Sequence, residues 1–75
     1  MINKSHRIWI WIQNNRLYKA VYNPREETLT IYNENDIILV RRKGFTEEQL
    51  KKLEIIFSSM GARKIDSNKE PFTYL

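Results

Sequence analysis

The fold is decided by residues 7–23, RIWIWIQ-NN-RLYKAVYN, which predict two strands joined by a two-residue turn. Apolar β-branched and aromatic residues are concentrated on both sides of Asn14-Asn15, and such residues are enriched in strands. Asparagine tolerates positive φ, which a tight hairpin turn requires at its central positions. The sequence therefore predicts an antiparallel hairpin over residues 7–23.

The residues that follow extend this hairpin into a meander. Residues 24–27 predict a turn, because Pro24 fixes φ, and residues 28–32 predict a third strand. The polar cluster at 33–36 predicts a second hairpin connection, which leads to a fourth strand over 37–42. Residues 62–66 are a candidate for a short fifth strand.

A helix is predicted over residues 47–60. Thr46 and Gln49 have the spacing of a capping box, and Gly61 is suited to a C-terminal cap. The apolar residues of the helix recur at helical spacing: Leu50, Leu53, Ile56, Phe57 and Met60. The fold class is therefore α+β, a four-stranded antiparallel meander sheet followed by one amphipathic helix. It forms a single domain, residues 1–66, with a C-terminal tail at 67–75.

The predicted strands carry apolar residues on both faces, whereas the chain encodes one helix to cover them. With Asn14-Asn15 as the turn, Trp11 lies opposite Tyr18 and Ile8 opposite Val21. We expect the helix to cover an aliphatic face made of Ile8, Ile10, Ile12, Leu17, Val21, Leu29, Ile31, Ile38 and Val40. The other face is aromatic and is expected to lack a helix; it contains Trp9, Trp11, Tyr18, Ala20, Tyr22, Tyr32, Ile37 and Leu39, flanked by Arg7, Arg16, Arg41, Thr28 and Thr30.

The composition limits the classes of protein to consider. The 75 residues include no cysteine and one histidine, which argues against disulfides and against thiolate or imidazole metal sites. The longest apolar run near the N-terminus, residues 8–12, is far shorter than the ~20 residues of a membrane span. We therefore expect a cytoplasmic protein without a membrane partner, a small-molecule substrate, a metal or a cofactor.

Residues that could carry catalysis are isolated from one another. His6 has no second histidine or cysteine near it, Ser58-Ser59 lies in the predicted helix without a base, and neither glycine belongs to a phosphate-binding loop. The sequence therefore predicts a binding protein and not an enzyme. A chain of this size buries only about 60% of its unfolded surface, which favours a homodimer.

Three interpretations account for the aromatic face. A second copy or the tail covers it, or unpaired bases stack on it while arginine and lysine contact phosphates, or a different protein docks there. The net charge of +4 favours nucleic acid. The leading hypothesis is that this face holds single-stranded DNA or RNA, and the alternative is a protein-interaction subunit whose aromatic face is buried in a homodimer or larger complex. The candidate nucleic-acid-binding residues are Trp9, Trp11, Tyr18, Tyr22, Tyr32, Arg7, Arg16, Arg41, Arg42 and Lys43.

Residues 41–50, RRKGFTEEQL, combine a basic strand end, a glycine and a capping box before an amphipathic helix. This segment and the element order resemble the single-stranded-DNA-binding domain of the positive-cofactor-4 family of transcriptional coactivators. Members of that family are dimers that hold unpaired DNA with aromatic and basic residues of curved sheets. The resemblance implies that Arg41, Arg42 and Lys43 contact phosphates near the sheet edge.

Overall fold

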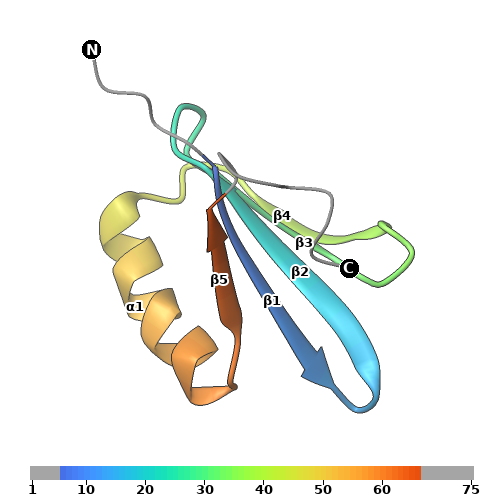
Figure 1. Cartoon of the computed structure of the whole chain (residues 1–75). Helices are drawn as coiled ribbons and strands as arrows, with labels where there is room; N and C mark the ends of the chain where they lie inside the picture. The colour runs from blue at the N-terminus through green and yellow to red at the C-terminus, as the bar shows by residue number, and fades with distance from the viewer. Residues whose placement is uncertain (1–5, 67–75) are drawn as a thin grey trace.

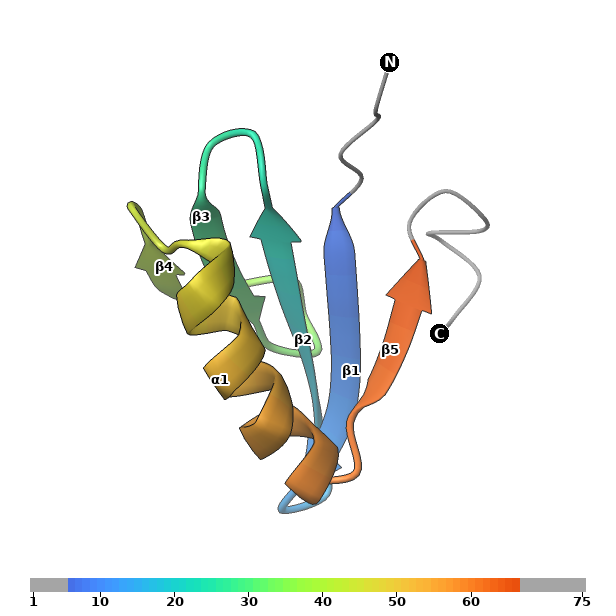
Figure 2. The ribbon, with the colours of Figure 1, turned by 90° about the vertical axis from the view of Figure 1, so that its left-hand side faces the viewer.

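A five-stranded antiparallel sheet carries one helix on one of its faces (Figures 1 and 2). This computed structural model describes residues 6–66, and its strand order is β4-β3-β2-β1-β5. The predicted α+β class is confirmed, and the candidate fifth strand is present at the edge next to β1. The predicted tail, residues 67–75, lies outside the described residues. The elements are β1 (Arg7–Gln13), β2 (Arg16–Asn23), β3 (Thr28–Tyr32), β4 (Ile38–Arg42), α1 (Glu47–Ser59) and β5 (Arg63–Asp66).

The first hairpin has the predicted turn and register. Asn14 and Asn15 adopt φ of 54° and 63°, which is the backbone of a type I′ turn. Ile12 pairs with Leu17, and the pairing continues without interruption to the other end of β1. The twist of a type I′ turn matches the twist of the flanking strands, so the two asparagines set the register of the longest hairpin in the sheet.

Helix α1 begins and ends where its capping residues predict. The Thr46 side chain accepts a hydrogen bond from the Gln49 backbone N–H at 3.2 Å, and the Gln49 side chain accepts one from the Thr46 N–H at 3.0 Å. At the other end Gly61 has φ of 77°, and the Ala62 N–H donates to the Phe57 carbonyl at 2.9 Å. This Schellman arrangement stops the helix and directs the chain into β5.

The helix covers the aromatic face of the β1–β2 hairpin and not the aliphatic face, which corrects the sequence-based assignment. Leu50 and Phe57 of α1 pack into a core with Trp9, Trp11 and Tyr22. The side chains that were expected beneath the helix in β1 and β2 lie on the opposite side of the sheet, which we call the reverse face. It includes Ile8, Ile10, Ile12, Leu17 and Val21.

The position of β5 explains which face the helix covers. Because β1 is antiparallel to both β2 and β5, the strands β4 and β5 run parallel to each other at opposite edges of the sheet. Helix α1 therefore forms a crossover between two parallel strands. With α1 toward the viewer the chain passes from β4 on the left to β5 on the right, which is a right-handed crossover (Figure 2). Nearly all such connections are right-handed, and this rule assigns α1 to the side of the tryptophans.

The third and fourth strands face α1 as expected, but they are out of phase with the first hairpin by one residue relative to the sequence-based register. Leu29 pairs with Tyr22 and Ile31 pairs with Ala20, so both lie on the helix side together with Val40, which pairs with Ile31. Strand side chains alternate between faces, so an offset of one residue in a connection exchanges them all. As a result the reverse face receives Thr28, Thr30, Tyr32 and Arg41 from these strands.

Tyr22 links the sheet to the start of the helix. Its hydroxyl donates a 2.7 Å hydrogen bond to the Phe45 carbonyl, and the side chain is fully buried. Burial raises the pKa of Tyr22 above 10; the carboxylates of Glu27 and Glu47 act in the same direction, and Arg7 acts against them. The neutral phenol is therefore the form that the folded state favours.

This shift predicts a loss of stability in alkali. A raised folded-state pKa means that the contribution of Tyr22 is complete below the unfolded value of 10.0 and disappears as the pH rises through the folded value. Urea unfolding from about pH 8 to about pH 11 should show the wild type losing more stability than Tyr22→Phe, which cannot ionise. A difference between the two proteins that stays constant over this range would contradict the prediction.

Candidate nucleic-acid interface

The aromatic residues of the sequence-based site are mostly in the core. Trp9, Trp11 and Tyr22 are 3%, 8% and 0% exposed, and the Phe57 ring lies 5.2 Å from that of Trp9 and 5.1 Å from that of Trp11. The expectation that these side chains lie on an uncovered face is wrong, because α1 packs against them. Burial beneath α1 leaves these three rings little exposed surface for a base, a second copy or another protein.

Four further candidates lie away from any shared site. Tyr18 is half-buried and stacks on Trp11 with ring centroids 5.7 Å apart. Arg7 forms an ion pair with Glu47 of the helix at 3.2 Å. Arg16 lies beside the tight turn, with its guanidinium 3.9 Å from the Glu34 carboxylate, and Arg42 pairs with Leu29 on the helix side of β4.

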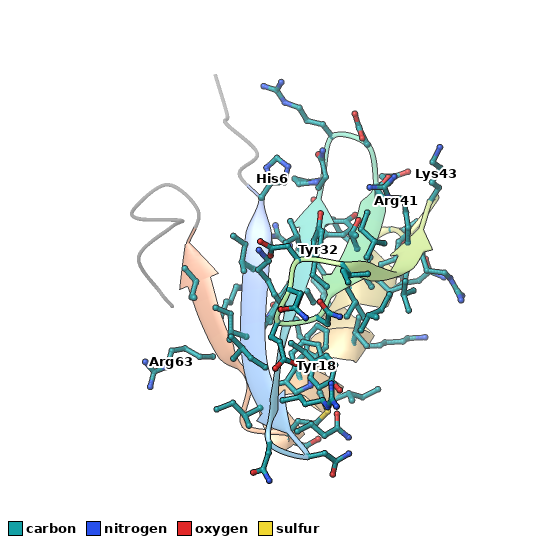
Figure 3. The ribbon with its side chains drawn as sticks, turned by 90° about the vertical axis from the view of Figure 1, so that its right-hand side faces the viewer. His6, Tyr18, Tyr32, Arg41, Lys43 and Arg63 are labelled. Atoms are coloured by element: carbon teal, nitrogen blue, oxygen red, sulfur yellow. The ribbon has the colours of Figure 1, made fainter. Side chains whose placement is uncertain are left out.

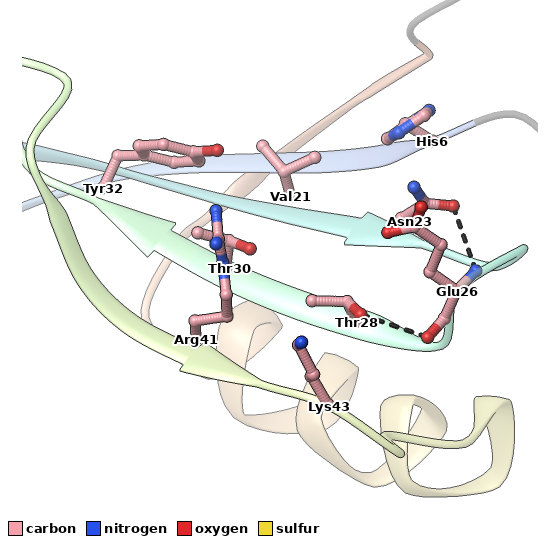
Figure 4. Close-up of a pocket in the computed structure, with 9 residues that line it drawn as sticks. All are labelled: His6, Val21, Asn23, Glu26, Thr28, Thr30, Tyr32, Arg41 and Lys43. Carbon is pink, nitrogen blue, oxygen red and sulfur yellow. Dashed lines mark hydrogen bonds between the residues drawn. The ribbon is translucent and has the colours of Figure 1, made fainter.

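The remaining candidates, Tyr32, Arg41 and Lys43, come together on the reverse face (Figure 3). They line a shallow hollow of about 350 Å³, which we call the basic hollow. Figure 4 shows that β2, β3, β4 and the residue before β1 all contribute to its walls. Its lining residues are His6, Val21, Asn23, Glu26, Thr28, Thr30, Tyr32, Arg41 and Lys43.

Strand alternation explains why these side chains meet. Thr28, Thr30 and Tyr32 are two residues apart along β3, so all three project from the same face. Arg41 pairs with Thr30 across β3 and β4, which aims its guanidinium over the middle of the hollow (Figure 4). Lys43 follows directly after β4 and closes the end near the turn between β2 and β3.

The hollow combines an aromatic ring with positive charge. The Lys19 ammonium lies 5.0 Å from the centre of the Tyr32 ring, a cation–π distance, and 3.3 Å from the Asp36 carboxylate. Arg41 and Lys43 supply two cations to the lining, against one carboxylate from Glu26. An anionic ligand with a planar group therefore finds cations and a ring within one hollow.

The wall near the turn is fixed by local hydrogen bonds. The Asn23 side-chain oxygen accepts from the backbone N–H groups of Arg25 and Glu26 at 3.0 and 3.4 Å. The Thr28 hydroxyl donates to the Glu26 carbonyl at 3.0 Å (Figure 4). These hydrogen bonds fix the conformation of the turn, which forms one wall of the hollow. The cationic groups of the hollow come from Arg41 and Lys43.

The other end of the reverse face is apolar. A second, wider hollow of about 690 Å³ lies between the tight turn and the end of α1. Its lining residues are Ile10, Trp11, Ile12, Leu17, Met60, Gly61, Arg63 and Ile65. The reverse face thus changes along the strands from basic and aromatic at one end to aliphatic at the other.

Potential metal ligands are dispersed over residues 6–66. Within this part of the chain no three histidine, aspartate or glutamate side chains are grouped to hold a metal ion. No helix among the same residues is long and apolar enough to cross a membrane.

Sequence reasoning missed Lys19, Asn23 and His6 as neighbours of the candidate residues. Lys19 could have been placed on this face, because it is two residues from Val21 in the same strand. The sequence-based site instead gave priority to the aromatic residues around Lys19.

Comparison with models of known families, with curated proteins and with solved structures gives no match to this chain. The resemblance to the positive-cofactor-4 family therefore stays a prediction.

Proposed function

We propose that this chain binds single-stranded nucleic acid in the basic hollow of the reverse face. The observation that supports this function best is the grouping of the Tyr32 ring with Arg41 and Lys43 on the sheet face that α1 leaves uncovered. In this arrangement the cations contact phosphates, and the ring stacks on a base. The proposed function is the one inferred from the sequence, but the proposed site lies on the reverse face and not on the face that contains Trp9 and Trp11.

The chemistry of the hollow favours an unpaired strand over a duplex. A base can stack on Tyr32 only if it is not already stacked within a helix, and such stacking contributes about 1–3 kcal/mol per base. The arginine guanidinium binds phosphate through two parallel hydrogen bonds, whereas lysine acts as a point charge. Neither group reads the edge of a base, so little dependence on sequence is expected.

Binding of dye-labelled oligonucleotides, followed by fluorescence anisotropy, tests this proposal. We expect a single-stranded oligonucleotide to bind more tightly than the duplex of the same sequence. Neutralising two phosphates with Arg41 and Lys43 should give a slope of about −1.4 in a plot of log K against log salt concentration. Absence of binding at low salt, or equal affinity for the duplex, would reject the proposal.

A further inference from the structure

Strand β4 is an edge of the sheet and exposes an apolar surface. It pairs with β3 on one side, and among the described residues no strand pairs with its other side. Its side chains Ile38, Leu39 and Val40 are 44%, 49% and 41% exposed, and the preceding Ile37 is 56% exposed. An exposed edge strand of this kind offers unpaired backbone groups and apolar side chains to another strand.

The charges at the two ends of β4 have opposite signs. The turn before the strand carries Glu34 and Asp36, whereas Arg41, Arg42 and Lys43 end it. In an antiparallel pair of two such strands, the basic end of each copy lies beside the acidic turn of the other. A parallel pair would place like charges together, which is destabilising.

We propose that β4 pairs with β4 of a second copy of this chain, antiparallel and about a two-fold axis. The strand is complementary to itself in charge, and a two-fold contact is the commonest form of self-association. Pairing would join the two sheets into one of ten strands and shield residues 37–40 from water. This inference rests on the edge of the sheet and does not depend on the proposed nucleic-acid binding.

The two-fold axis of such a pair is perpendicular to the sheet, so each face keeps its identity across the dimer. Both copies of α1 lie on one side, and both basic hollows lie on the other. The hollows are lined by Arg41 and not by Arg42, which projects from the helix side of β4. Changes at Arg42 therefore test the dimer without altering the lining of the hollow.

Disulfide trapping tests the geometry directly, because the chain contains no cysteine of its own. Leu39 is skipped in the pairing of β4 with β3 and lies midway between Asp36 and Arg42 in the sequence. A two-fold axis at Leu39, which sets Arg42 opposite Asp36 of the other copy, therefore places the two Leu39→Cys residues opposite each other, with Cα atoms about 4.5–5.5 Å apart, within the range that a disulfide spans. The matched control is Ile55→Cys, at an exposed position on α1. We expect Leu39→Cys to form covalent dimers at least about tenfold faster than the control. Equal rates for the two variants would overturn the proposal.

Sedimentation equilibrium tests the complementarity of charge. The wild type should be dimeric, and Arg42→Glu should weaken the dimer about tenfold because two symmetry-related contacts change sign. Adding Glu34→Lys to Arg42→Glu should restore association to within about threefold of the wild type. A wild type that stays monomeric at all concentrations would overturn the proposal, and so would a double variant no better than Arg42→Glu. A monomer would direct attention to a strand of a different protein as the partner of β4.

Discussion

Replacing Phe57 with alanine is expected to lower the free energy of unfolding by about 3–5 kcal/mol, the cost of truncating a buried aromatic side chain. Phe57 is 3% exposed and is the contact through which α1 reaches the indoles of Trp9 and Trp11. A domain of this size has a total stability of only about 4–11 kcal/mol. The variant should therefore be partly unfolded at 37 °C.

Thermal and urea unfolding followed by circular dichroism would measure this loss. Ile55→Ala is the matched control, because it truncates an aliphatic side chain that is 71% exposed on the same helix. It should change the free energy of unfolding by no more than about 0.5 kcal/mol. Similar losses in the two variants would mean that the Phe57 side of α1 does not pack against the sheet.

Reversing the charge of Arg41 is expected to weaken binding of a single-stranded oligonucleotide by about 100-fold. Arg41→Glu would remove the proposed charge-assisted hydrogen bond to phosphate, and it places a carboxylate over the centre of the basic hollow. Tyr32→Ala should weaken the same complex by about tenfold, since it removes one stacking ring. The loss for Tyr32→Ala should also persist at high salt, whereas the loss for Arg41→Glu should shrink.

Arg16→Glu is the control for this series. It makes the same change of charge at a residue beside the tight turn, outside the lining of the hollow. Fluorescence anisotropy should show a loss of less than about threefold for this variant. If Arg16→Glu weakened binding as much as Arg41→Glu, the affinity would follow the net charge of the protein and not the basic hollow.

Features set by neighbouring residues could be predicted from the sequence. A tight turn requires residues that tolerate positive φ, as at Asn14-Asn15, and a capping box requires the spacing of Thr46 and Gln49. Both motifs are present as expected. Sorting the residues of β1 and β2 into two faces was also correct, because the tight turn fixes their register.

Features set by distant parts of the chain could not be predicted in the same way. The face that α1 covers depends on the pairing of β5 with β1, which turns the helix into a right-handed crossover. The faces of β3 depend on the length and shape of the turn at residues 24–27, where Glu27 adopts φ of 49°. The aromatic residues Trp9 and Trp11 were interpreted as a ligand-binding surface, whereas their rings pack against Phe57 of the helix. Residue type alone does not distinguish these two roles.

The sequence predicted some residues of the candidate site but not which side chains surround them. Tyr32 and Arg41 were expected on the face without a helix, and the structure places them there. The prediction gave them the wrong neighbours, because the turn at residues 24–27 puts β3 and β4 out of phase with the first hairpin. The residue types indicate what these side chains can bind. Which of them lie side by side depends on the register of β3 and β4 against β2.

The location of both indoles beneath α1 makes them an internal optical reporter of the helix–sheet layer. Their emission depends on whether α1 stays docked, since Trp9 and Trp11 are in contact with Phe57. The basic hollow lies on the other side of the sheet, where Tyr32 is the aromatic residue of its lining. Tryptophan fluorescence can therefore report whether the protein stays folded while the basic hollow is titrated with ligand. Unfolding and ligand binding can thus be distinguished in one sample.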